Sequence, residues 1–148
     1  MHNKLYFHFE DISEFTLPNS IHEWIKGVII HEEFILSEIN VIFCSDSYLL
    51  TLNKKHLAHN YYTDILTFDY RTNPKKIYGD LFISQERIIE NASSFNVSIN
   101  NELLRIVVHG LLHLFGYLDK SEKDKKLMRS MEDFYLSLYS KKYVSRET

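Results

Sequence analysis

The sequence is poor in cysteine, proline and glycine, and these shortages exclude several kinds of protein. Its single cysteine, Cys44, cannot form an internal disulfide, which is typical of proteins from a reducing compartment. With two prolines and four glycines, the chain has no linker, repeat or low-complexity segment. A length of 148 residues with 45% hydrophobic content suits one core, so we expect a single domain over residues 1–148.

Long hydrophobic runs are also absent. No apolar stretch approaches the ~20 residues that a membrane-spanning helix needs. The residues after Met1 lack the charged and apolar regions of a signal peptide. We therefore expect a cytoplasmic protein without a membrane partner.

Positive charge is scarce, since 17 basic residues face 20 acidic ones and the net charge is −3. A protein that coats nucleic acid nonspecifically needs a basic face to displace counterions, so a nucleic-acid role here requires a local patch. Two segments could supply one, although such short charge runs are more often solvated surface. They are Lys54, Lys55, His56 and His59 in the first segment, and Arg71, Lys75 and Lys76 in the second.

Residues 109–119 have the ligand spacing of a metal site. Two helical residues four positions apart project from nearly the same face, about 6 Å from each other, so His109 and His113 can chelate one ion. Gly116 can take the left-handed conformation that ends a helix, which lets the chain fold back and bring Asp119 toward both imidazoles. Three ligands with a fourth position open are the layout of a catalytic zinc site, so we expect one Zn²⁺ per chain.

The surroundings favour this interpretation over two ordinary histidines on an amphipathic helix. The helix is apolar nearly all round and should be buried, where two uncompensated imidazoles would be costly. The spacing follows the metzincin motif with aspartate in the third place. Gly110, however, stands where H-E-x-x-H peptidases have their glutamate base. The sequence thus predicts the metal cage without the peptidase base.

Two polar residues precede His109 on the same helix. Glu102 and Arg105 lie seven and four positions before it, which places both on its side of the helix. We take Arg105 as a candidate catalytic residue. Glu102 is a candidate for orienting a ligand or a substrate group.

Hydrophobic periodicity predicts an α+β fold: a small mixed β-sheet covered by helices, with a zincin-like metal-site helix near the C-terminal end. The strand order stays open. Ser20 and Asn100 are expected to cap their helices, and the last helix should begin with a capping box of Ser121 and Asp124. The expected strands are 5–9, 39–44, 63–70 and 77–83; the expected helices are 21–34 and 84–95 and three that begin near 45, 100 and 121. The residues expected to face inward on the last helix are Leu127, Met131, Phe134 and Leu138.

Three blocks of the sequence resemble the YbeY family of rRNA-maturation endoribonucleases. The metal segment HGLLHLFGYLD is similar to the family signature H-G-x-L-H-L-x-G-Y-D-H. Residues 63–68, TDILTF, resemble the family strand T-[DN]-V-L-S-F, and residues 79–84, GDLFIS, resemble G-D-I-x-I-S. The blocks follow one another in the family's order over nearly the whole chain.

Two positions depart from the family pattern. Asp119 stands where the family usually has a third histidine, and aspartate can still bind zinc. Leu57 stands where the family has an arginine that is considered functionally important. Arg105, Lys55 or His59 could supply the positive charge instead.

The resemblance implies a zinc-dependent endoribonuclease specific for single-stranded RNA, acting in 3′-end maturation of small-subunit rRNA and in ribosome quality control. Its partners would be single-stranded RNA, rRNA and the small ribosomal subunit. One alternative is a metallopeptidase-like hydrolase, which the ligand spacing supports and Gly110 weakens. Another is a non-catalytic ribosome-associated zinc protein, which the missing arginine at Leu57 supports. Four tyrosines could stack on unpaired bases, although they more often pack in strands: Tyr61, Tyr62, Tyr70 and Tyr78.

Overall fold

The computed structural model describes residues 4–57 and 63–144, and within them the strands and helices follow one another in the expected order. This confirms the α+β class. The strands are β1 (Leu5–Phe9), β2 (Ile35–Cys44), β3 (Ile65–Asp69) and β4 (Lys76–Ser84). The helices are α1 (Ile21–His31), α2 (Asp46–Leu57), α3 (Gln85–Phe95), α4 (Ile99–Phe115) and α5 (Glu122–Tyr139), followed by the π-helical turn η1 (Ser140–Val144).

The four strands form one mixed sheet in the order β1-β2-β4-β3. Strands β1, β2 and β4 are parallel, with Val41 of β2 opposite Leu81 of β4. Strand β3 runs antiparallel to β4 and forms a hairpin with it. Strand β3 therefore forms one edge of the sheet.

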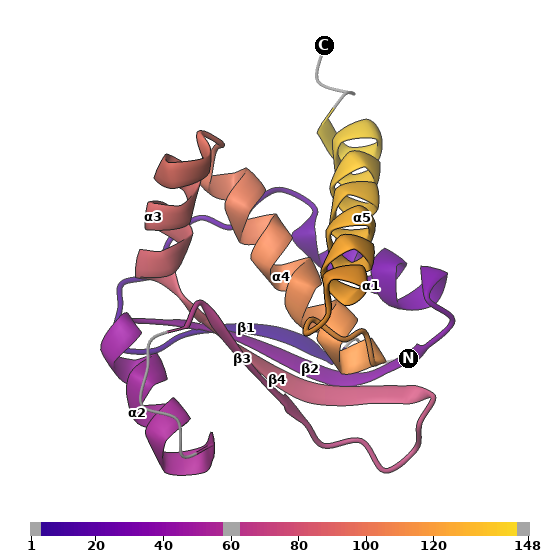
Figure 1. Ribbon diagram of the computed structural model, residues 1–148, viewed down its shortest axis with the longest axis horizontal. Coiled ribbons are helices and arrows are strands. Elements are labelled where there is room, and N and C mark those ends of the chain that lie inside the picture. The colour runs from indigo at the N-terminus through magenta and orange to yellow at the C-terminus, as the bar shows by residue number, and fades with distance from the viewer. Residues whose placement is uncertain (1–3, 58–62, 145–148) are drawn as a thin grey trace.

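The helices cover the two faces of the sheet unequally (Figure 1). Helix α4 crosses one face diagonally, with α1, α3 and α5 around it, and their apolar side chains form the main core with β2 and β4. Trp24 belongs to this core, and its indole N–H donates to the Tyr135 carbonyl at 2.9 Å. Helix α2 packs on the other face over a smaller cluster that contains Cys44, Leu49 and Leu66. Burial, with nearby acidic groups, raises the pKa of the Cys44 thiol to about 12.

Of two predicted cap residues, Ser20 holds its expected place and Asn100 does not. Ser20 is the N-cap residue of α1, but it has a φ of 62° and its side chain accepts no hydrogen bond from the helix. Helix α4 begins one residue before Asn100, because Ser98 accepts a hydrogen bond from the Asn101 N–H at 3.0 Å and Asn100 falls in the first turn. The capping box of Ser121 and Asp124 is confirmed.

The inward face of α5 also differs from the prediction. Leu127, Phe134 and Leu138 are 52%, 41% and 37% exposed, and only Met131 of the four predicted residues packs, partly buried, against the core. The buried residues of the helix are Met128, Glu132, Tyr135 and Tyr139. A hydrophobic pattern assigns a glutamate to the outside, but Glu132 can be buried because it has charged partners, described below. Among the described residues, no helix has the length and apolar character needed to cross a membrane.

Candidate metal centre

Helix α4 brings two histidines together on its one partly exposed side. Most of the helix is buried against the sheet and its neighbours, but His109 and His113 are only half-buried. Their Nε2 atoms lie 3.0 Å apart and their ring centroids 4.6 Å apart. The predicted pairing of the two side chains is therefore present.

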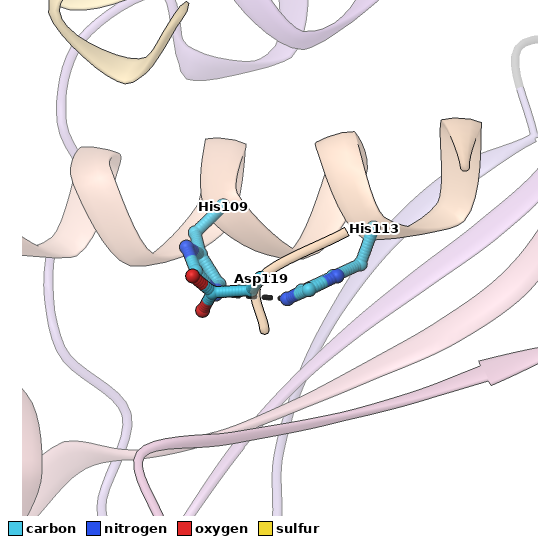
Figure 2. A group of neighbouring side chains, drawn as sticks. All are labelled: His109, His113 and Asp119. Atoms are coloured by element: carbon cyan, nitrogen blue, oxygen red, sulfur yellow. Dashed lines mark hydrogen bonds and ion pairs between the residues drawn. The ribbon is translucent and has the colours of Figure 1, made fainter. Parts of the chain in front are cut away.

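The chain after α4 folds back toward these histidines. Gly116 has a φ of 108°, and the N–H groups of Gly116 and Tyr117 donate to the carbonyls of His113 and Leu112, each at 3.0 Å. This is a Schellman-type helix end, which a glycine allows at little cost. It turns the chain so that the Asp119 carboxylate approaches both imidazoles (Figure 2).

Three ligand atoms then converge. One atom each of His109, His113 and Asp119 lies within 4.8 Å of the other two, and Asp119 Oδ2 is 3.6 Å from His109 Nε2. This group can hold a metal ion. Asp124 does not belong to it, because its carboxylate accepts from the Ser121 N–H in the capping box of α5.

The hydrogen bonds of the two Nδ1 atoms determine which nitrogen carries the proton in each neutral imidazole. His109 Nδ1 lies 2.6 Å from Glu132 Oε2, and His113 Nδ1 lies 3.0 Å from the Tyr117 carbonyl oxygen. A carboxylate and a carbonyl only accept, so each Nδ1 carries the proton and donates. In the neutral rings both Nε2 lone pairs then face each other at 3.0 Å. Two such acceptors repel each other unless a cation lies between them, which suits metal binding.

The two histidines differ in their readiness to take a proton. Burial disfavours protonation of His109, but the hydrogen bond and charge of Glu132 outweigh burial and raise its pKa. Burial and the neighbouring His109 lower the pKa of His113. The acidic groups around the pair thus favour one positive charge at this place, and His109 is where they favour it most.

Glu132 is the residue of this site that the sequence prediction missed. Its side chain is 8% exposed, and besides His109 it accepts a hydrogen bond from Arg105 Nη1 at 2.8 Å. Arg105 Nη2 donates to Asp133 at 2.8 Å. The only signal in the sequence was spacing, since Glu132 falls four residues after Met128 and three before Tyr135 on the buried side of α5.

Arg105 and Glu102 lie beside the ligand cluster rather than in it. Arg105 reaches His109 only through Glu132, which both residues contact. Glu102 is 3% exposed, and burial raises its pKa. A hydrogen bond from Asn91 and the charge of Arg105 partly offset this increase. The carboxylate bonded to His109 is therefore Glu132 and not Glu102.

Two clefts meet at the ligand cluster. The first, which we call the β3 cleft, has a volume of about 510 Å³ and lies between residues 63–67 and the segment from His113 to Asp119. The second, the α5 cleft, has a volume of about 340 Å³ and is lined by α3, α4 and α5, including Glu102, Arg105 and Glu132. Asp64, His109 and Asp119 line both clefts. A long substrate could therefore pass the ligand atoms from one cleft to the other.

Gly110 is explained by its contacts with the sheet. A Cβ atom there would lie 2.5 Å from Ile65 Cδ1 and 3.1 Å from Leu81 Cδ2. A glutamate at this position would require the ends of both strand side chains to shift. The close packing of α4 on β3 and β4 thus disfavours the base that H-E-x-x-H peptidases require.

The described residues of the two basic segments, Lys76 included, and the described tyrosines proposed for base stacking line neither cleft. Lys54, Lys55 and His56 occupy the last turn of α2, and Leu57 ends that helix. Arg71 and Lys75 lie over the Phe34 ring, at 5.9 and 5.7 Å from its centroid. The rings of Tyr70 and Tyr78 pair at 5.4 Å, and Tyr78 alternates with Ile77 and Gly79, which face α4. His59, Tyr61 and Tyr62 fall outside the described residues.

Known proteins with similar sequences decide the family. Residues 6–140 match the sequence profile described as Endoribonuclease YbeY. The chain belongs to this family. A YbeY endoribonuclease of Cytophaga hutchinsonii is 43% identical over 140 residues, covering 93% of this chain and 98% of that protein. One of Flavobacterium johnsoniae is 46% identical over 135 residues, covering 90% and 95%.

The YbeY-family chain also resembles a solved structure. The solution structure of TM1509 from Thermotoga maritima superimposes with a TM-score of 0.65 and 24% sequence identity, covering 97% of this chain and 93% of that one. At this identity the likeness concerns the fold alone. It agrees with the α+β arrangement of sheet and helices described above.

Proposed function

We propose that this YbeY-family chain is a zinc-dependent endoribonuclease that cuts single-stranded RNA, and that it acts on small-subunit rRNA in 3′-end maturation and ribosome quality control. Family membership supports the RNA-cleaving class. The observation that carries the metal dependence is the convergence of His109 Nε2, His113 Nε2 and the Asp119 carboxylate. Zn²⁺ suits two imidazoles and a carboxylate better than Mg²⁺, which prefers oxygen ligands.

The residues around the cluster have separate tasks in this proposal. His109, His113 and Asp119 would hold the ion, which would supply Lewis-acid polarisation of a phosphoryl oxygen. Glu132 and the Tyr117 carbonyl would hold the two imidazoles so that each Nε2 atom points toward the ion. The two clefts would let an RNA strand pass across these atoms.

We also propose roles for the two candidates on the early part of α4. Arg105 lines the α5 cleft next to His109, and Glu132 and Asp133 hold its guanidinium in place. A fixed cation there would bind the phosphate backbone of the substrate close to the cleavage position. Glu102 would support Arg105 from the wall of the same cleft.

Metal analysis and three substrates test the function. The purified protein should contain about one zinc per chain, and it should cut an unpaired RNA but neither a duplex nor casein. A chelator should abolish cleavage, and added zinc should restore it. Cleavage of casein would favour the metallopeptidase-like alternative. Zinc binding without cleavage of any substrate would favour the non-catalytic ribosome-associated factor.

A further inference from the structure

The α5 cleft begins at the ligand cluster and leads away from it. It shares His109 and Asp119 with the β3 cleft, so a strand that passes the ligand atoms must continue into it or leave the surface. Of the four carboxylates that line it, three are engaged, and the fourth, Asp64, lies where the two clefts meet. Glu132 binds Arg105 and His109, Asp119 belongs to the ligand group, and Glu102 is buried beside Arg105.

Two cations of this cleft remain without a carboxylate partner. Lys125 and Arg129 line the cleft from α5, and their spacing of four residues puts them on the same side of the helix. Arg105 pairs with Glu132 and Asp133, but in the part of the chain that the structure describes Lys125 and Arg129 form no ion pair. The protein as a whole is acidic, so two unpaired cations beside the candidate metal centre mark a local site for anions.

The wall opposite these cations carries an exposed aromatic ring. Phe95 is the last residue of α3, lines the same cleft and is 63% exposed. A solvent-exposed phenylalanine ring in the same cleft as these cations offers a flat surface on which an unpaired base can stack. Phosphate-binding cations with an aromatic platform are the combination that recognises single-stranded nucleic acid without reading its sequence.

We propose that the α5 cleft is the substrate subsite for the nucleotides on one side of the scissile phosphate, with Lys125 and Arg129 on successive phosphates and Phe95 stacked on a base. This inference rests on the proposed ribonuclease function and assigns its strand path. The ligand is a single RNA strand, since stacking on Phe95 requires a base that is not paired.

The test measures binding of a short single-stranded RNA with 2′-O-methyl ribose by fluorescence anisotropy at several salt concentrations, and a gel verifies that the RNA remains uncut. Replacing Lys125 and Arg129 together by alanine should reduce the slope of log affinity against log salt by about 1.4, since each phosphate contact on a single strand contributes about 0.7. The control is Lys123→Ala with Lys126→Ala, which removes the same charge from exposed positions of α5 that do not line the cleft. Its slope should stay close to that of the wild type.

The aromatic contact has its own variants. Phe95→Leu keeps an apolar side chain but removes the ring, and it should weaken RNA binding roughly 5- to 150-fold. Phe95→Tyr keeps the ring and should restore most of the affinity. Equal affinities for Phe95→Leu and the wild type would remove stacking from the proposal.

The outcomes separate this inference from the proposed function. If the wild type cuts RNA but both double variants bind RNA alike, the subsite is refuted and the nuclease stands. If the wild type cuts no RNA but the Lys125 and Arg129 pair alone lowers the salt slope, the nuclease is refuted and the subsite stands. A polyglutamate peptide that loses more affinity than RNA in this double variant would assign the cleft to acidic peptides and overturn the proposal.

Discussion

Replacing Glu132 by glutamine should weaken metal binding although Glu132 is not a ligand. The carboxylate accepts two hydrogen bonds, from His109 Nδ1 at 2.6 Å and from Arg105 Nη1 at 2.8 Å. Glutamine has one acceptor oxygen and one NH₂ donor. If the oxygen faces His109, the NH₂ group faces the Arg105 donor. If it faces Arg105, the NH₂ group requires an unprotonated Nδ1, which moves the imidazole proton to Nε2 and blocks the ligand atom.

The size of the effect follows from this conflict. Loss of a carboxylate that orients a metal-bound histidine typically costs about 10–100-fold in metal affinity, or about 1.4–2.8 kcal/mol. Burial places Glu132→Gln at the upper end, since its side chain is 8% exposed and water cannot readily replace the lost partner. The unfolding free energy should also fall by about 1–3 kcal/mol.

Competition with a chromophoric chelator measures the zinc affinity, and Asp133→Asn is the matched control. Asp133 pairs with the same arginine at 2.8 Å, but it is 58% exposed and its carboxylate binds Arg105 rather than a ligand histidine. It should therefore leave the zinc affinity unchanged within about twofold, since an exposed ion pair contributes about 0–1 kcal/mol to stability. Equal affinities for Glu132→Gln and the wild type would refute the reasoning, and so would an equal loss in both variants.

Three further predictions concern the other carboxylates and Arg105. Asp119→Ala should lower zinc affinity by more than the ~10–100-fold typical of residues that contact the ligands from behind. Asp124→Ala should cost only about 0.3–1 kcal/mol of folding stability. A larger loss of zinc affinity in Asp124→Ala than in Asp119→Ala, measured by chelator competition, would contradict this prediction. Arg105→Ala should retain zinc but cut unpaired RNA at least ~10-fold more slowly, and unchanged cleavage would make Arg105 a purely structural partner of Glu132. Burial raises the pKa of Glu102 above 4.5, so its charged form destabilises the folded state. Glu102→Gln should therefore become more stable relative to the wild type as the pH rises from about 4.5. A difference in urea-unfolding free energy that does not change with pH would contradict this.

The fold was predictable where the signal is local. All four strands and five helices within the described residues follow in the predicted order, because periods of 2 and 3.6 residues are properties of short segments. The limits of the elements were less predictable. Strand β2 begins at Ile35 instead of 39 because Ile35 pairs with Lys76 of β4, a contact that the sequence of β2 cannot reveal. The parallel pairing of β2 with β4 is equally non-local, which is why the strand order stayed open.

The candidate site divides in the same way. Its three ligand groups lie within eleven residues, so helical spacing and one glycine were enough to predict that they converge. Glu132 lies 23 residues beyond His109 on another helix. A charged residue in an amphipathic pattern usually faces solvent, but Glu132 is buried. The predicted inward face of α5 was therefore wrong by one position.

The orientation of His113 depends on contacts between residues that are even farther apart in the sequence. His113 donates to the carbonyl of Tyr117, and the hydroxyl of the same tyrosine donates to Glu32 at the end of α1, at 2.8 Å and 85 residues away. Glu32 also accepts from Tyr135 of α5. Burial and this hydrogen bond raise the pKa of Tyr117 to about 12, so the phenol remains a donor through the neutral range. The loop that carries Asp119 is thus tied to α1 and α5, and the ligand geometry depends on the packing of both helices.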